Sequence, residues 1–138
     1  MYPPNLVAPM AKDLTDYGFE PLSSPEEVTD AIENTQGTLL LVVNSVCGCA
    51  AANARPGAKL AIKNEHVPDR LVTVFAGVDR EATGKAREYL LPYPPSSPSI
   101  ALFKDGKLVK MIERHQIEGR SAYQIADDLK NSFDEFCS

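Results

Sequence analysis

Tryptophan is absent from this 138-residue sequence, and histidine and cysteine are scarce, with two and three residues. Cys47, Cys49 and Cys137 are an odd number of cysteines, which argues against a framework of paired structural disulfides. The 14 basic residues are outnumbered by 19 acidic ones, for a formal net charge of −5. No run of basic residues could follow a phosphate backbone, so we expect no nucleic-acid partner.

Long hydrophobic runs are also missing. The longest one extends from Leu39 to Val43 and is far too short to cross a bilayer. The opening residues, MYPPNLVAPMAKDL, contain neither the basic stretch nor the apolar stretch of a secretory signal. We therefore expect a cytoplasmic protein with no membrane partner. Thiols stay reduced in the cytosol, so closely spaced cysteines there indicate catalysis or metal binding rather than a structural bridge.

The remaining composition is that of a folded globular protein. Hydrophobic residues make up 43% of the chain and charged residues 24%, an ordinary balance for such proteins. The sequence shows no internal repeat, low-complexity tract or linker, and the proline-rich stretch from Leu91 to Ser99 is expected to be a loop. We therefore expect a single domain covering residues 1–138. The sequence leaves the oligomeric state open.

Hydrophobic periodicity and capping residues predict alternating helices and strands. Helices are expected from about Leu6 to Tyr17 and over residues 24–37, 50–64, 79–90 and 121–136. Strands are expected over residues 38–45 and 70–77 and in a hairpin whose turn is Asp105-Gly106. The first strand is almost continuously apolar, which is typical of a strand buried on both faces. Pro56 interrupts the third helix, so a kink is expected there.

This order of elements indicates an α/β fold. Strands separated by helices form parallel units, and the hairpin adds an antiparallel strand. We therefore expect a central mixed sheet flanked by helices on both faces. Ligand and catalytic sites of such sheets lie at the carboxyl ends of the parallel strands. The segment Cys47-Gly48-Cys49 lies there, between the first long strand and the helix that follows it.

The position of the two cysteines predicts reactive thiols. A cysteine at a helix N-terminus is close to unpaired N–H groups and to the positive end of the helix dipole, which lower its pKa. Cys47 is expected just outside the helix and to be the more exposed, whereas Cys49 lies on the first turn. Arg55 would add positive charge if it folded back, although a solvated position is the simpler expectation for an exposed charge.

The spacing of the pair favours disulfide exchange. In an extended chain, residues two apart lie near the upper limit of disulfide reach, about 6.8 Å between Cα atoms. A turn at Gly48 would shorten that distance, because glycine adopts dihedral angles that other residues resist. A strained disulfide is more oxidising. One thiolate could therefore attack a disulfide, and the other could resolve the mixed disulfide that results.

Other roles for the cysteines stay open on the residues alone. Free cysteines are often buried and only pack, and the chain could be a partner-binding module with incidental thiols. Thiolates also bind zinc and iron–sulfur clusters, so the alternative function is a metal or iron–sulfur carrier using Cys47, Cys49 and Cys137. Cys137, the penultimate residue, is either a free terminal thiol or an auxiliary one that resolves or pairs between chains.

Four segments resemble the bacilliredoxin family of bacterial thioredoxin-like proteins: NSVCGCAAANARPGAKLA, TVFAGVDREATGKAREYL, PSSPSIALFKDGKLV and RHQIEG. The resemblance covers nearly the whole chain. It implies a thioredoxin-like fold, here with an extra N-terminal helix. It also implies a thiol–disulfide oxidoreductase that removes bacillithiol, a low-molecular-weight thiol, from mixed disulfides on cytosolic proteins. Cys47 would attack and Cys49 would be the second cysteine. No cofactor is implied, because bacillithiol or a similar thiol would be substrate or co-substrate.

The resemblance also extends to a proline beside the site. Thioredoxins place a cis-proline before their third strand, facing the cysteines, and Ser97-Pro98 stands at that point here. Gly48, Ser97 and Pro98 are therefore expected to form the substrate site. The chain departs from the common thioredoxin pattern in its Cys-X-Cys spacing and in the lack of a tryptophan before the motif. Thioredoxins also bury an acid beneath the cysteines, where this chain offers only Asn44.

Overall fold

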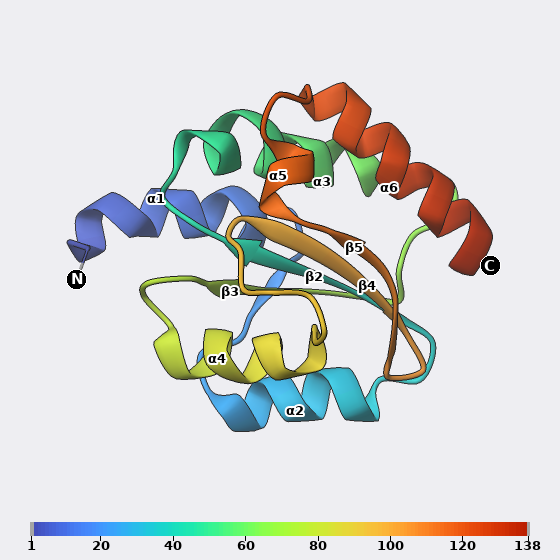
Figure 1. The fold of residues 1–138 in the computed structure, drawn as a ribbon, viewed down its shortest axis with the longest axis horizontal. Coiled ribbons are helices and arrows are strands. Elements are labelled where there is room, and N and C mark those ends of the chain that lie inside the picture. The colour runs from blue at the N-terminus through green and yellow to red at the C-terminus, as the bar shows by residue number, and fades with distance from the viewer. Residues whose placement is uncertain (1, 138) are drawn as a thin grey trace.

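A five-stranded mixed sheet lies at the centre of the computed structural model, which describes residues 2–137 (Figure 1). The strand order is β1-β3-β2-β4-β5. β2 pairs in parallel with β3, which pairs in parallel with β1; β2 is antiparallel to β4, and β4 to β5. The strands are β1 (Glu20–Pro21), β2 (Thr38–Asn44), β3 (Arg70–Phe75), β4 (Ser99–Lys104) and β5 (Lys107–Ile112). The expected mixed sheet is confirmed, and the ends of the expected domain, residues 1 and 138, lie outside the described residues.

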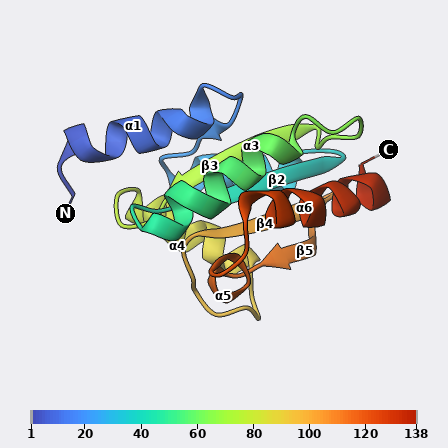
Figure 2. The ribbon, with the colours of Figure 1, turned by 90° about the horizontal axis from the view of Figure 1, so that it is seen from above.

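Helices cover both faces of this sheet (Figures 1 and 2). One face carries α2 (Pro25–Asn34) and α4 (Arg80–Tyr89), and the other carries α3 (Arg55–Ala61) and α6 (Ala122–Phe136). The N-terminal helix α1 (Pro4–Thr15) contacts α3. A short helix, α5 (Arg114–Ile117), connects β5 to α6. The sequence pattern did not predict β1 or α5, because elements of two and four residues are too short to show a period.

The core consists of two layers that meet at β2. All seven residues of this strand are buried. Leu40 and Val42 belong to the cluster packed under α3 and α6, whereas Leu39, Leu41 and Val43 belong to the cluster under α2 and α4. Successive side chains of a strand point to opposite faces of the sheet, so the central residues of a strand between two helical layers are apolar on both faces. The continuous apolar run is therefore explained.

Local signals in the sequence fix several ends of elements. Ser121 and Gln124 form a capping box at the start of α6. Ser24 caps α2, as expected. The hairpin between β4 and β5 turns at Asp105 and Gly106, whose φ angles are 50° and 80°. These left-handed angles at both central residues match the twist of the strands, which is why Asp-Gly is so favourable there.

Candidate active site

Cys47 and Cys49 follow the carboxyl end of β2, where the chain turns into helix. The carbonyl of Cys47 accepts hydrogen bonds from the N–H groups of Ala50 and Ala51, at 3.1 and 3.3 Å. Cys47 therefore lies directly before the helical segment, just outside its N-terminus. Unpaired N–H groups and the positive end of the helix dipole lie at this position. The location agrees with the one that the sequence predicts.

The helix after the cysteines begins with a wide turn. Residues Ala50–Ala54 form a π-helical turn, labelled η1, in which the N–H of Arg55 donates to the carbonyl of Ala50. Pro56 has no N–H to donate and its ring crowds the preceding turn. The hydrogen bond just before it therefore spans five residues instead of the four of an α-helix. The kink expected at Pro56 thus takes the form of a π turn, a feature often found at functional sites. Regular α-helix resumes at Arg55.

Hydrogen bonds surround the Cys47 sulfur. The Ser45 hydroxyl donates to Cys47 Sγ at 3.3 Å, and the Cys47 N–H donates to Ser45 Oγ at 3.3 Å. The pKa of Cys47 lies below its ordinary value. Partial burial acts to raise it, but this effect is outweighed by hydrogen bonds from the Cys49 thiol, the Ser45 hydroxyl and the N–H groups of Ala50 and Cys49. Cys47 is therefore the thiol that ionises first.

The pKa of Cys49 moves in the opposite direction. Burial raises it first, and the hydrogen bond to Cys47 and the negative charge of the Cys47 thiolate raise it further. The positive charge of Arg114 lowers it, without reversing the shift. Cys47 was expected to be the more exposed of the two, but both residues are half-buried, so exposure does not distinguish them. Hydrogen bonding and charge, rather than exposure, make the two thiols different.

Arg55 is not the solvated residue that the sequence suggests. Its side chain is buried, with 5% exposed. Its Nη1 donates to Asn44 Oδ1 at 2.9 Å and to the Ser45 carbonyl at 3.1 Å, and its Nε donates to Asp13 Oδ2 at 2.9 Å. Lys59 also donates to Asp13, at 2.5 Å. The correction has a physical reason: a charge leaves water when enough acceptors replace its hydration, and here α1 and the end of β2 supply them.

Asn44 occupies the buried position beneath the cysteines. It is 1% exposed. Its Oδ1 accepts from the Ser45 N–H at 2.9 Å as well as from Arg55, and its Nδ2 donates to the Met10 carbonyl at 3.2 Å. Arg55 connects this layer to a carboxylate, that of Asp13 in α1. Sequence reasoning missed Asp13, because two residues 42 positions apart carry no joint pattern. It also missed Ser45, although this residue lies only two positions before Cys47.

The Ser97–Pro98 peptide bond is cis, as expected. It directly precedes β4, in which Ser99 pairs with Val43 near the end of β2. Nη1 of Arg114 donates to the Ser97 carbonyl at 3.2 Å, and the Arg114 N–H donates to Ser96 Oγ at 3.4 Å. The proline loop is thus tied to α5. Arg114 was also missed from the sequence, since α5 itself was not predicted.

Gly48 leaves the space beside the two thiols open. It is exposed, and a methyl group at this position would meet no other atom within 4 Å. Its backbone is helical rather than left-handed. The glycine-specific turn that was expected to shorten the distance between the cysteines is therefore not adopted while the thiols are reduced.

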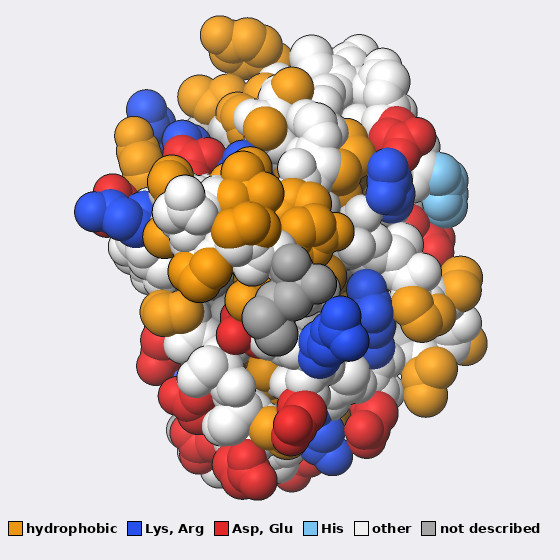
Figure 3. Space-filling model, turned by 90° about the vertical axis from the view of Figure 1, so that its left-hand side faces the viewer, with side chains coloured by type: hydrophobic (Ala, Val, Ile, Leu, Met, Phe, Trp, Pro, Cys, Tyr) orange, Lys and Arg blue, Asp and Glu red, His pale blue; other side chains and the backbone are white. Residues whose placement is uncertain are grey.

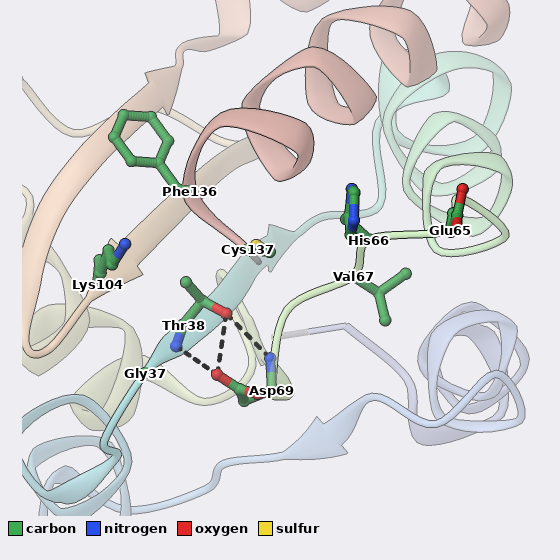
Figure 4. A pocket seen from close by; sticks show the side chains of 9 residues that line it. All are labelled: Gly37, Thr38, Glu65, His66, Val67, Asp69, Lys104, Phe136 and Cys137. Carbon is green, nitrogen blue, oxygen red and sulfur yellow. Dashed lines mark hydrogen bonds between the residues drawn. The ribbon is translucent and has the colours of Figure 1, made fainter.

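Cys137 lies at the far end of β2 from the other two cysteines. It is 7% exposed and lines a cavity with Thr38, the first residue of β2, and Asp69 (Figure 4). Burial raises the pKa of its thiol. The seven residues of β2 separate it from Cys47, roughly 20 Å of extended chain. The three thiols therefore do not come together within one chain, and residues 2–137 hold no cluster of three metal-ligating side chains.

The carboxyl end of β2 points toward the side of the molecule seen in Figure 3. Hydrophobic side chains gather in the middle and upper parts of this face, and acidic side chains gather along its lower part, where α2 and α4 lie. No helix within the described residues is long and apolar enough to cross a membrane.

Comparison with known proteins agrees with this geometry. A family model described as disulphide isomerase matches residues 2–137. A bacilliredoxin from Cytophaga hutchinsonii is 58% identical over 135 residues, which cover 98% of this chain and 99% of that protein. A bacilliredoxin from Salinibacter ruber is 54% identical and covers 99% of this chain and 81% of its own length.

Solved structures confirm the fold. Mitochondrial thioredoxin 3 from Saccharomyces cerevisiae, in its oxidised form, aligns with a TM-score of 0.61 at 18% identity, over 90% of this chain and 99% of its own. Thioredoxin from Fasciola hepatica aligns with a TM-score of 0.58 at 18% identity, over 83% and 99% of the two chains. The chain has a thioredoxin-like fold and belongs to the bacilliredoxin family.

Proposed function

We propose that this oxidoreductase reduces mixed disulfides between a low-molecular-weight thiol, bacillithiol or a similar one, and cytosolic proteins. Cys47 is the attacking residue and Cys49 the resolving one. The observation that carries the proposal is the placement of two half-buried thiols at one helix N-terminus, with the Ser45 hydroxyl donating to Cys47 Sγ. The opposite pKa shifts of the two thiols agree with this geometry. Such a pair supplies one thiolate that attacks the mixed disulfide and one protonated thiol that attacks later, in the resolving step.

In the first step the Cys47 thiolate attacks the sulfur of the low-molecular-weight thiol within the mixed disulfide. A bond forms between that sulfur and Cys47, and the bond to the client cysteine breaks. The client leaves as a thiolate, which takes a proton from water. The open space at the exposed residue Gly48 favours access of a protein-bound disulfide to this sulfur.

In the second step Cys49 attacks the Cys47 sulfur and releases the small thiol. The products are a Cys47–Cys49 disulfide and the free small thiol, so the two electrons that reduced the client come from the pair. The order follows from coupling between the thiols: the thiolate of Cys47 raises the pKa of Cys49. Once Cys47 is bonded that charge is gone, whereas the attraction of Arg114 persists, so Cys49 ionises more readily.

The test uses a client protein with one cysteine that carries bacillithiol, incubated with wild-type, Cys47→Ser and Cys49→Ser protein. We expect the Cys49→Ser variant to release the client and to gain the mass of one bacillithiol. The wild type should end as an internal disulfide, and Cys47→Ser should do neither. A client modified with glutathione, run in parallel, compares the two thiols.

Three results would contradict the proposal. If Cys47→Ser rather than Cys49→Ser gained the mass, the two roles would be reversed. If the wild type released no client at any pH, the proposed reaction would be wrong. If the glutathione adduct were reduced faster than the bacillithiol adduct, bacillithiol would not be the preferred thiol.

A further inference from the structure

We propose that Ser45 is a further catalytic residue, whose hydroxyl donates to the Cys47 thiolate, and that Arg55, anchored by Asp13, is the positioning residue that holds Ser45 in place. This inference rests on the proposed function, because it assigns a role in the same attack by Cys47. It concerns residues that surround the reactive sulfur on its buried side.

The hydrogen bonds of Ser45 direct its single proton at the sulfur. A serine hydroxyl has one proton to donate and two lone pairs that accept. The Cys47 N–H occupies one lone pair at 3.3 Å, and the O–H points to Cys47 Sγ at 3.3 Å. The side chain is buried, with 7% of the residue exposed, so water competes little for this proton. A donor aimed at the atom that carries the charge stabilises the thiolate over the thiol.

Ser45 stands on a backbone that is fixed from two directions. Its N–H donates to Asn44 Oδ1 at 2.9 Å, and its carbonyl accepts from Arg55 Nη1 at 3.1 Å. The same Nη1 also donates to Asn44 Oδ1, at 2.9 Å. The guanidinium therefore binds both the Ser45 carbonyl and the Asn44 Oδ1 that accepts from the Ser45 N–H. Rotation of this peptide, which would move the hydroxyl away from the sulfur, would break these bonds.

Asp13 keeps the guanidinium in this position. Its carboxylate accepts from Arg55 Nε at 2.9 Å and from Lys59 at 2.5 Å. A buried guanidinium without a partner is costly, so the pair with Asp13 makes the interior position tenable. The helix α1 is thereby linked to the reactive loop. Arg55 acts through position, because the groups that lower the pKa of Cys47 are thiol, hydroxyl and N–H donors.

The test measures alkylation of Cys47 by iodoacetamide between pH 5 and pH 10, with the modified residue assigned by fragment mass spectrometry. For Ser45→Ala we expect the rate at pH 6 to fall about tenfold, because one hydrogen bond to a charged group is worth about that factor. At pH 10 the rates should converge, since Cys47 is then ionised in both proteins. Ser45→Thr retains a hydroxyl and should retain most of the rate. Ser132→Ala is the control, because it removes a buried hydroxyl that donates to the Asp128 carbonyl in α6.

The role of Arg55 is tested through Ser45. Arg55→Met should slow alkylation at pH 6 in wild-type protein and have no further effect on the rate in Ser45→Ala protein, because its influence passes through that hydroxyl. Arg55→Lys, which keeps the charge in a different shape, is the milder variant should Arg55→Met not fold. Equal pH profiles for wild type and Ser45→Ala would overturn the proposal for Ser45. Additive effects of the two substitutions would overturn the proposal for Arg55.

Alkylation requires no disulfide substrate, so this experiment separates the two proposals. A shifted pH profile in Ser45→Ala, together with no reduction of any mixed disulfide by wild-type protein, would refute the proposed function and leave the contact between Ser45 and Cys47 supported. Reduction of the mixed disulfide by wild-type protein, together with an unshifted pH profile in Ser45→Ala, would support the proposed function and refute the role of Ser45.

Discussion

Alanine in place of Gly57 should destabilise the protein, whereas the same change at Gly84 should stabilise it. Both glycines lie in helices, Gly57 in α3 and Gly84 in α4. Alanine favours helix over glycine by about 1 kcal/mol. Propensity alone would therefore predict a more stable protein in both cases. The tertiary surroundings of the two positions differ, and this difference gives the two substitutions opposite signs.

A β-carbon at Gly57 would overlap α6. It would lie 2.7 Å from Ile125 Cγ2, 2.9 Å from Ile125 Cβ and 3.2 Å from the Ala122 carbonyl oxygen. These atoms belong to a branch point and to backbone, which cannot rotate away. Overpacking of this kind costs about 1–3 kcal/mol. With the upper end of that range, less about 1 kcal/mol of helix propensity, we expect a loss of about 2 kcal/mol in the free energy of unfolding.

Gly84 provides the matched control. It is exposed, and a β-carbon there would meet no atom within 4 Å. The free energy of unfolding should therefore rise by about 1 kcal/mol. For a chain of 138 residues the melting temperature should fall by about 7 °C in Gly57→Ala and rise by about 3 °C in Gly84→Ala. Urea denaturation followed by circular dichroism measures both changes. A Gly57→Ala protein as stable as wild type, with an unchanged m-value, would refute the close approach of α3 and α6.

The remaining predictions concern the two thiols. Cys49→Ala should raise the pKa of Cys47 more than Cys49→Ser does, because only alanine removes the donor to the Cys47 sulfur. Alkylation of Cys47 should therefore be slower in Cys49→Ala than in Cys49→Ser at pH 6, and the two rates should be similar at pH 10. Identical pH profiles of the two variants would contradict this contact. Arg114→Gln should slow release of the small thiol from the Cys47 mixed disulfide, because Arg114 lowers the pKa of Cys49. The side chain is about half exposed, so we expect an effect of about twofold to fivefold that weakens at high salt and is absent in Arg114→Lys. A release rate in Arg114→Gln that equals the wild-type rate at low salt would show that this charge does not assist Cys49.

Much of the fold follows from local pattern. The apolar run of β2, the Asp-Gly turn and the capping box at Ser121 each depend on residues close together in sequence, and each is present as expected. The same holds for the position of Cys47, because a thiol between a buried strand and a helix must lie at the helix N-terminus. Local pattern could not reveal β1 or α5, which are too short to display a period.

The sequence by itself determined the alternation of strands and helices, the two-sided burial of β2 and the placement of both motif cysteines at its carboxyl end. Only the tertiary structure decided that Arg55 is buried, that Asp13 of α1 accompanies it, and that Cys137 lies far from the reactive pair. The reason is physical. Periodicity and caps record interactions between neighbours in the chain, whereas a buried charge or thiol is positioned by partners that packing brings from distant segments. Ser45 belongs to both groups: it is next to the motif in sequence, but Arg55 and Asn44 fix its orientation.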